Sequence, residues 1–510
     1  MSQAAQMQLS IDWDRSAGVR DPLFFGYFLE HFHRQVYGGV YDPGSPLAGD
    51  NGFRGDVLDA VRRLRPAVIR WPGGCFASGY HWRHGVGPDR VPSYDKAWRV
   101  EEPNTFGTDE FIEFCRLTGA EPYLCANAGT GTAEEMSDWV EYCNLNGRSR
   151  FARLRQENGH ARPHQVRLWG IGNENYGWWE IGARDSSEWG RFVREAAKMM
   201  RRVDDRVVLS AAAFIDLDRD LDLLVDWGLS LLRTAAPQID LLAIHGYAVL
   251  TEGAGYLESV GRIGFAETRI RRAERLLELL GPDQRIRIAF DEWNPRGWHF
   301  PGFDGRQRPD ISEWDRNDDN SAYTMADAIL HASFLNTCLR HCASVAMTCL
   351  SPVVNTRGPI FTHGGGIVLR PTYHVCDLYT SLLAPEVLDA HARIPVFTAA
   401  GQDAAGPVTL PRADTVATVD RASGRLAVAV CNLHPDQPLD CVIWVPGRAL
   451  AGPGQVTTLT GATPSSFNDV GHPDDVRPTA APVPADGDTC RIRLGPHSVS
   501  IVELHTSPAN

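Results

Sequence analysis

Eight short apolar runs alternate with longer amphipathic stretches through most of the chain, and this alternation restricts the possible folds more than any other feature. The stretches between the runs have apolar residues at helical spacing, as in 52–64, 108–118, 187–202, 266–280 and 320–338. Eight strand–helix units in this order predict a (β/α)8 TIM barrel over residues 21–385, with its active site at the carboxyl ends of the strands. The apolar runs themselves are residues 24–30, 67–72, 121–128, 166–172, 207–213, 240–247, 286–292 and 345–350.

The sequence pattern changes after about residue 385. Between residues 386 and 510, β-rich runs such as 425–434 and 490–504 are bounded by Gly, Pro, Asp and Asn, which predicts an antiparallel β-sandwich domain. We expect a strand within residues 1–20 to join this sandwich. Residues 453–488 are rich in Pro, Thr, Ser, Asp and Gly, and they are predicted to form a loop.

Charge and cysteine usage exclude several classes of partner. A net charge of −13 argues against a nucleic-acid surface and an anionic polymer, so a neutral ligand is favoured. No run of about 18 apolar residues could span a membrane, and the first residues lack the features of a secretory signal, so a cytoplasmic location is expected. Cys338, His341 and Cys342 have metal-ligand spacing, but no second pair completes a zinc site, and no metal is expected.

Two glutamates follow apolar runs and are the first candidates for catalysis. Glu174 comes after the fourth run, and Glu292 ends the seventh. Burial among Trp169, Trp178 and Trp179 would disfavour the charged form of Glu174 and raise its pKa, as a general acid requires. Two carboxylates across a barrel mouth, one pushed toward the neutral form and one kept ionised, are the minimum equipment for hydrolysing a glycosidic bond. The alternative is that each glutamate caps a helix or pairs with an arginine.

Other polar residues end the neighbouring runs. Glu30 follows the first run, where it could accept hydrogen bonds from sugar hydroxyls. Arg70 ends the second run, where a fixed cation would keep a neighbouring carboxylate ionised. His245 and Tyr247 close the sixth run; the tyrosine hydroxyl could donate to the nucleophile, or both side chains are satisfied in the core. Cys75 has only a weak claim as a nucleophile against a simple packing role.

Aromatic side chains near the two glutamates are candidates for contacting a sugar. Trp178 follows Glu174, and Trp298 follows Glu292. The C–H face of a sugar packs on apolar rings, so both could stack on the substrate. Tryptophans packed in the core are the competing interpretation.

Several long motifs, in this order, resemble glycoside hydrolase family 51, the α-L-arabinofuranosidase family of the clan A barrels. They are EHFHRQVYGGVYDP, RWPGGCFASGYHWRHGVGP, EEPNTFGTDEFIEFCRLTGAEPYLCANAGTG, LWGIGNENYG, IHGY and FDEWN, with VAVCNLH and NDVGHPDDVRP in the C-terminal region. The resemblance implies a retaining mechanism without a cofactor, and a homo-oligomer, often a hexamer. It implies Glu174 as general acid/base, Glu292 as nucleophile, Asn173 as the partner of the sugar 2-hydroxyl, Glu30 as a binder of sugar hydroxyls and Tyr247 as the partner of the nucleophile.

The chain departs from the family pattern at positions that bear on the substrate. Many members have asparagine where Cys75 stands, and a glutamine near the eighth strand where Ser351 or Pro352 stands. The loops at 176–185 and 294–306 also differ. Exo-acting release of terminal arabinofuranose is the leading hypothesis. Another furanoside such as a galactofuranoside, a β-xyloside, endo-action on a β-glucan, and a barrel that binds carbohydrate without cleaving it are the alternatives.

Overall fold

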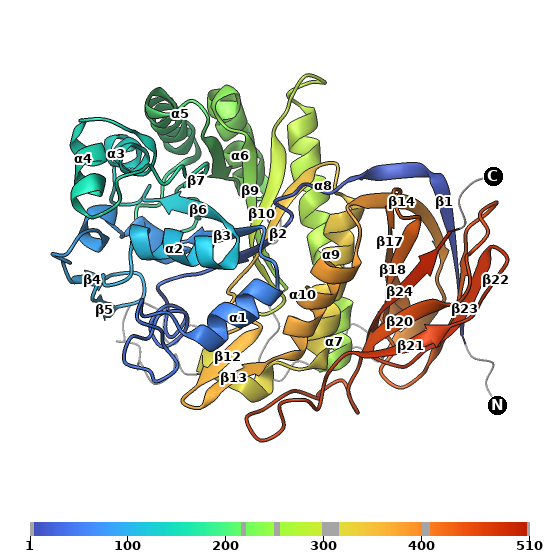
Figure 1. Cartoon of the computed structure of the whole chain (residues 1–510). Coiled ribbons are helices and arrows are strands. Elements are labelled where there is room, and N and C mark those ends of the chain that lie inside the picture. Colours follow the sequence, from blue (N-terminus) through green and yellow to red (C-terminus); the bar gives the residue numbers. More distant parts are fainter. Residues whose placement is uncertain (1–4, 216–220, 249–254, 298–315, 400–407, 507–510) are drawn as a thin grey trace.

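Eight short parallel strands close into a barrel, as predicted (Figure 1). The computed structural model describes residues 5–215, 221–248, 255–297, 316–399 and 408–506. Around the barrel the strands follow the order β10-β11-β2-β3-β6-β7-β8-β9. Each predicted apolar run overlaps one of them: β2 (Phe25–Phe28), β3 (Val68–Trp71), β6 (Glu121–Ala126), β7 (Leu168–Ile171), β8 (Val208–Ala212), β9 (Leu241–Tyr247), β10 (Arg287–Asn294), which extends two residues beyond its run, and β11 (Val345–Leu350).

Side chains from all eight strands fill the barrel interior below the rim. Because helices cover the outside and this packing fills the inside, the strands are buried on both faces, and their sequences are nearly continuous apolar runs rather than alternating ones. The few polar side chains inside the strands are paired; the Tyr123 hydroxyl, for example, contacts Ser210 and donates to Asp291. The interior cluster includes Phe28, Val68, Tyr123, Leu168, Leu241, Ala289 and Met347, with Val208 packed against it.

Amphipathic helices surround the barrel, and their ends carry ordinary capping signals. The side chain of Asp185 accepts from the backbone of Glu188 to begin α5, and Gly119 ends α2 with a φ of 79°. One helix, α9, is buried almost all round because it lies between the barrel and the C-terminal sheet (Figure 1). The helices are α1 (Gly55–Arg63), α2 (Thr108–Thr118), α3 (Ala133–Asn144), α4 (Arg150–Glu157), α5 (Ser186–Val203), α6 (Leu221–Ala235), α7 (Tyr256–Gly261), α8 (Phe265–Glu278), α9 (Met325–Arg340) and α10 (Pro371–Leu382).

The C-terminal domain is a ten-stranded sheet in the order β21-β20-β24-β18-β17-β14-β1-β19-β23-β22. Strands from both halves of this order contribute to one apolar cluster, so the sheet curls around a core of its own. The first strand, β1, pairs antiparallel with β14 and parallel with β19 (Figure 1). The bounds are β1 (Gln6–Val19), β14 (Glu386–Arg393), β17 (Ala413–Asp420), β18 (Arg425–Asn432), β19 (Leu439–Trp444), β20 (Gly454–Leu459), β21 (Thr479–Val483), β22 (Ala485–Asp486), β23 (Thr489–Leu494) and β24 (Ser498–His505).

Short hairpins complete the described structure. They pair β4 (Ser93–Asp95) with β5 (Val100–Glu102), β12 (Ile360–His363) with β13 (Gly366–Leu369), and β15 (Val396–Ala399) with β16 (Val408–Pro411). Within the described ranges, no helix combines the length and the apolar character that crossing a membrane would need.

Candidate active site

Glu174 and Glu292 lie close together at the rim formed by the carboxyl ends of the strands. Glu174 lies just beyond β7, after Gly172, whose φ of 71° suits glycine. Glu292 lies within β10, beside His245 of β9. One oxygen of each carboxylate and one nitrogen of His245 all lie within 4.8 Å of one another. The two carboxyl groups are therefore close enough to act on the same bond of a ligand.

An extra residue in β10 turns two neighbouring acids toward the barrel interior. Between the pair formed by Ala289 and the pair that Glu292 forms with His245, β10 advances one residue more than β9. In a regular strand, adjacent side chains would point to opposite faces. Here Asp291 and Glu292 are both buried, and both lie within ion-pair distance of Arg70.

The Arg70 guanidinium, at the end of β3, connects the acids of different strands. Its Nη1 donates to Glu292 Oε2 at 2.8 Å, and its Nη2 donates to Asn173 Oδ1 at 2.7 Å. Its Nε lies 3.4 Å from Asp291 Oδ2. Burial lowers the pKa of Arg70, but the negative groups around it outweigh burial and raise this pKa well above its usual range. The site therefore contains a fixed positive charge in contact with Glu292.

His245 is a second cation in the site, and it reverses the predicted behaviour of Glu174. Its Nδ1 lies 2.8 Å from Glu174 Oε1, and its Nε2 lies 3.3 Å from Asp291 Oδ1. Burial lowers the pKa of His245, but Glu292, Asp291 and Glu174 outweigh burial and raise it to about 10. For Glu174, burial raises the pKa, whereas the hydrogen bond and charge of His245 lower it more, so the net shift is downward. The predicted rise in the pKa of Glu174 is therefore wrong.

The tryptophans near Glu174 contribute less burial than predicted. Trp169 lies in the core, where its ring meets Trp139 edge to face at 5.5 Å. Trp178 is 75% exposed, and Trp179 is 39% exposed. Trp179 Nε1 donates to Glu174 Oε2 at 2.7 Å, so this ring orients the carboxylate rather than burying it. Trp298, the other predicted sugar-stacking residue, lies outside the described residues.

Glu30 is held by several donors on one of its oxygens. Its Oε1 accepts from the backbone of Gly74 at 3.0 Å, from the backbone of Phe76 at 3.2 Å and from Trp98 Nε1 at 3.2 Å. Burial, together with the charge of Glu292, raises the pKa of Glu30 to about 8 despite these hydrogen bonds. Glu30 is thus a fixed polar group at the rim, and with a pKa of about 8 it is mostly protonated at neutral pH.

Gly74 lies between three of these polar side chains. A Cβ atom on Gly74 would be 3.2 Å from Glu292 Oε2, 3.5 Å from Asn173 Nδ2 and 3.6 Å from Glu30 Oε1. Because Gly74 has no side chain, these three polar groups can lie close to its backbone. A ligand bound beside Gly74 would have all three residues as neighbours.

Tyr247, at the end of β9, contacts the Glu292 oxygen that Arg70 leaves free. Its hydroxyl donates to Glu292 Oε1 and lies 3.5 Å from Ser351 Oγ. Arg357 lies over the Tyr247 ring, 4.6 Å from its centroid, and its Nη2 donates to the hydroxyl at 3.5 Å. Ser351 and Arg357 therefore both lie next to the Tyr247 hydroxyl.

The Cys75 thiol hydrogen-bonds the carboxylate of Glu180, a residue of the loop after β7. Burial, followed by the charges of Glu180 and Glu174, raises the pKa of Cys75 well above its usual range. A thiol in this state is protonated and is a poor nucleophile. Glu180 itself has a pKa raised to about 7, because it is buried and lies near Glu174.

Comparisons with known proteins agree with this geometry. One matching family model is described as the α-L-arabinofuranosidase 1 domain, at residues 60–249, and another as the α-L-arabinofuranosidase C-terminal domain, at residues 291–498. α-L-Arabinofuranosidase C of Emericella nidulans is 34% identical over 482 residues, which cover 90% of each chain. The chain belongs to the α-L-arabinofuranosidase family. It is therefore a glycoside hydrolase.

Other α-L-arabinofuranosidases are similar over nearly the whole chain. The intracellular exo-α-(1→5)-L-arabinofuranosidase of Streptomyces lividans is 32% identical and covers 95% of this chain and 72% of its own. The arabinose complex of the Thermotoga maritima enzyme has a TM-score of 0.87 and 31% identity, covering 98% of this chain and all of that one. The thermostable GH51 enzyme of Thermotoga petrophila has a TM-score of 0.85 and 32% identity over the same shares.

Sequence reasoning missed four residues of the arabinofuranosidase site. Asp291 carried a signal, because it is an acid inside an apolar strand, but regular alternation would place it outside the barrel. Glu180, Trp98 and Arg357 lie in loops between elements, and nothing in their local sequence indicates that they reach the rim. Their contacts join segments far apart in the chain.

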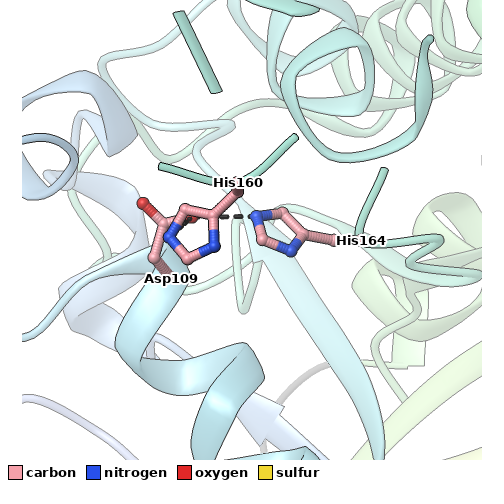
Figure 2. Close-up of side chains that lie close together, drawn as sticks. All are labelled: Asp109, His160 and His164. Carbon is pink, nitrogen blue, oxygen red and sulfur yellow. Dashed lines mark hydrogen bonds and ion pairs between the residues drawn. The ribbon is translucent and has the colours of Figure 1, made fainter. Parts of the chain in front are cut away.

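A second cluster of titratable groups lies away from the site in this arabinofuranosidase (Figure 2). His160 and His164, between α4 and β7, approach Asp109 of α2, with His164 Nε2 at 2.8 Å and His160 Nε2 at 3.6 Å from Asp109 Oδ1. Arg116 Nη2 lies 3.2 Å from His164 Nδ1, and because arginine only donates, Nδ1 accepts. Burial lowers the pKa of His164 and favours the neutral ring, whose proton is then on Nε2 and donates to Asp109. That nitrogen has no lone pair for a metal ion. The hydrogen bonds of His164 instead attach the segment between α4 and β7 to α2.

Proposed function

We propose that the chain is a retaining, exo-acting α-L-arabinofuranosidase that releases terminal arabinofuranose from oligosaccharides by double displacement. The proposal rests above all on Glu174 and Glu292, which have one oxygen each within 4.8 Å of the other's. Retaining glycosidases hold their carboxyl groups about 5 to 5.5 Å apart, whereas inverting enzymes leave about 6.5 to 9.5 Å for a water. The separation at this rim favours a covalent glycosyl-enzyme intermediate.

In the first step, Glu292 is the nucleophile and Glu174 the general acid. Arg70 and Tyr247 donate to different oxygens of Glu292, which orients the carboxylate toward the substrate. A Glu292 oxygen attacks the anomeric carbon, the glycosidic C–O bond breaks, and the leaving oxygen takes a proton from Glu174. His245 passes its Nδ1 proton to Glu174 across their 2.8 Å contact, because the pair shares one proton at the start of the reaction.

In the second step, Glu174 acts as general base. Formation of the ester removes the charge of Glu292, which is one of the groups that raise the pKa of His245. Ionised Glu174 takes a proton from a water whose oxygen attacks the anomeric carbon. The bond between Glu292 and the sugar breaks, and Glu292 leaves as a carboxylate. The proton returned to Glu174 restores the shared proton of the starting state.

The groups around Gly74 fit a small neutral sugar. Asn173 Nδ2 and the carboxyl group of Glu30 lie near Glu292 beside Gly74, so Asn173 and the second oxygen of Glu30 can bind sugar hydroxyls close to the anomeric carbon. Trp178 lies beside Trp179 at an edge-to-face angle of 85° and is largely exposed, so it offers an apolar surface for the departing sugar on the Glu174 side.

Another glycoside is the second candidate, because two family positions differ. The Cys75 thiol hydrogen-bonds Glu180, and the Ser351 hydroxyl lies 3.5 Å from the Tyr247 hydroxyl. Both side chains are therefore engaged with protein groups. A galactofuranoside, a β-xyloside or a β-glucan would meet the same pair of acids but a different set of hydroxyl partners. The catalytic residues do not distinguish these substrates.

A panel of 4-nitrophenyl glycosides tests the proposal. It comprises the α-L-arabinofuranoside, β-D-galactofuranoside, β-D-xyloside and β-D-glucoside, with Glu292→Ala as the control. We expect release from the arabinofuranoside, retention of configuration by NMR of the first product, and loss of activity in the control. Release from another glycoside alone would reject arabinofuranose as substrate, and an inverted first product would reject double displacement.

Further assignments extend this proposal. Likeness to the GH51 enzyme of Thermotoga petrophila supports membership of glycoside hydrolase family 51 in clan A. Likeness to an enzyme named as intracellular supports a cytoplasmic location. We place the domain boundaries at 1–20, 21–385 and 386–510, because β1 pairs with β14 and β14 begins at Glu386. A homo-oligomer such as a hexamer is proposed from the family resemblance, and light scattering tests it.

A further inference from the structure

Glu180 is a buried carboxylate at the rim to which the catalytic steps assign no role. It is 4% exposed and belongs to the same loop as Trp179, which contacts Glu174. Ser78 Oγ donates to Glu180 Oε1, and Asn173 Nδ2 donates to Glu180 Oε2 at 3.3 Å. The Cys75 thiol is a further donor. All three neighbours donate, which suits a group that accepts through both oxygens.

Asn173 is held from both sides of its amide. Arg70 Nη2 donates to Oδ1 at 2.7 Å, while Glu180 accepts from Nδ2. A reversed amide would face a donor with its NH2 group and an acceptor with its oxygen, so this pair of contacts fixes the orientation. Because an amide nitrogen has two hydrogens, one N–H is left for a ligand. Nδ2 lies close to Gly74, 3.5 Å from where a Cβ atom on that residue would lie.

We propose that Glu180 is a positioning residue that fixes Asn173 as a hydrogen-bond donor to a hydroxyl of the bound sugar. The inference rests on the proposed function, in which the sugar occupies the space between Asn173, Gly74 and Glu292. Without Glu180, the Asn173 amide keeps its contact with Arg70 but loses the acceptor that holds Nδ2 in place. The donor then points toward the substrate for only part of the time. The loop that carries Glu180 would thus contribute to specificity, because it orients the Asn173 donor toward sugars that have a hydroxyl within its reach.

Two substitutions separate the reach of Glu180 from its charge. Glu180→Asp keeps the charge but withdraws the carboxylate by one methylene from Asn173. Glu180→Gln keeps the reach, because its Oε1 can face Asn173 while its NH2 group faces the Ser78 hydroxyl, which can also accept. We expect Glu180→Gln to keep kcat/KM within about three-fold of wild type, and Glu180→Asp to lower it about 10-fold or more, mainly through kcat. The reverse order would overturn the proposal, because charge would then matter and position would not.

A double-mutant cycle tests whether Glu180 acts through Asn173. The variants are Asn173→Ala, Glu180→Ala and the double substitution, with kcat/KM measured on 4-nitrophenyl α-L-arabinofuranoside. Glu180→Ala is expected to lose about 10- to 100-fold alone and little more on the Asn173→Ala background. Losses that multiply fully in the double variant would overturn the proposal. Glu195→Ala, which removes an exposed carboxylate paired with Lys198 on α5, is the matched control and should leave activity unchanged.

The same data separate failure of this inference from failure of the proposed function. A wild-type enzyme that is silent on every glycoside of the panel would reject the proposed function, and the inference would fall with it. An active enzyme in which Asn173→Ala costs nothing would reject Asn173 as a sugar contact, and with it the role of Glu180. An active enzyme with an impaired Asn173→Ala variant and multiplicative losses would reject the role of Glu180 alone. Melting temperatures of all variants identify any that fail to fold, for which the Glu180→Asp and Glu180→Gln comparison decides.

Discussion

The carboxylates at the rim differ in the hydrogen-bond donors that surround them, and this difference bears on the chemical role of each carboxylate. Glu292 accepts from a guanidinium and a phenol, whereas Glu174 accepts from an imidazole and an indole. Glu30 has a pKa near 8 and can donate as well as accept when it binds a hydroxyl. These contacts support the proposal that Glu174 and His245 transfer the proton and that Glu292 is the nucleophile.

His245→Asn tests whether the proton of the general acid is shared with His245. Asparagine can still donate to Glu174 but carries no charge, so the pKa of Glu174 should rise. The shared proton, however, should leave at lower pH, because the imidazole with a pKa near 10 is gone. We expect the alkaline limb of the kcat/KM profile to move to lower pH by more than one unit. An alkaline limb that stays in place would contradict the shared proton.

Gly74→Ala tests whether the space between Asn173, Glu30 and Glu292 is the sugar site. The added methyl would lie 3.2 Å from Glu292 Oε2, so it would crowd the nucleophile and any sugar bound beside it. We expect kcat/KM to fall by about 100-fold or more, since displacement by about 1 Å can cost that much. Gly364→Ala, at a glycine with nothing within 4 Å of the added atom, is the control. Near-normal activity of Gly74→Ala would show that the sugar does not bind beside Gly74.

The identities of rim residues could be predicted from sequence, but their protonation could not. Glu174, Arg70 and Tyr247 each lie at or just beyond the carboxyl end of a strand, and these ends surround one barrel mouth, so their proximity follows from the fold. The pKa of Glu174 depends on a contact with His245, 71 residues along the chain, and no local pattern reveals such a contact. The same is true of Glu180, whose Ser78 contact spans 102 residues.

At the scale of elements, alternation of apolar runs was sufficient to place all eight barrel strands. It could not predict the extra residue in β10, because a bulge changes the facing of side chains without changing composition. Residues 453–488, predicted to be a loop, contain β20, β21 and β22. β21 and β22 are the two edge strands of the sheet, and four of the five residues of β21 are exposed, so little apolar pattern is needed there.

His341, at the end of α9, links this helix to α8. It contacts Glu267 at 3.2 Å and Glu274 at 2.9 Å, and these hydrogen bonds raise its pKa to about 9 from 6.5. A raised pKa gives stability that is fully present below the unfolded pKa and is lost as pH rises through the folded pKa. We expect His341→Gln to cost about 1 to 2 kcal/mol near pH 6 and almost nothing near pH 10. Chemical denaturation at both pH values measures this, and an equal loss at the two would exclude the ion pair as the cause.

At the scale of the whole molecule, the C-terminal sheet has two buried faces with different partners. Along β18, Ala427, Ala429 and Cys431 belong to the core shared with the barrel helices, whereas the alternate residues belong to the core of the sheet itself. Arg340 of α9 also donates to Asp414 at 2.7 Å. The sheet therefore continues the core of the barrel rather than resting on its surface.

This shared core predicts that barrel and sheet unfold together. Ile501 of β24 faces the barrel side, and Val502 faces the sheet's own core. Replacing either by alanine should cost about 1 to 5 kcal/mol. If the two domains are one cooperative unit, each substitution lowers the midpoint of activity loss and the midpoint of far-UV circular dichroism by the same amount. If they are independent, Val502→Ala lowers the sheet transition alone and leaves the midpoint of activity loss in place. Coincident shifts are expected, because the apolar surface of β24 and β18 has no other cover once the barrel helices leave it.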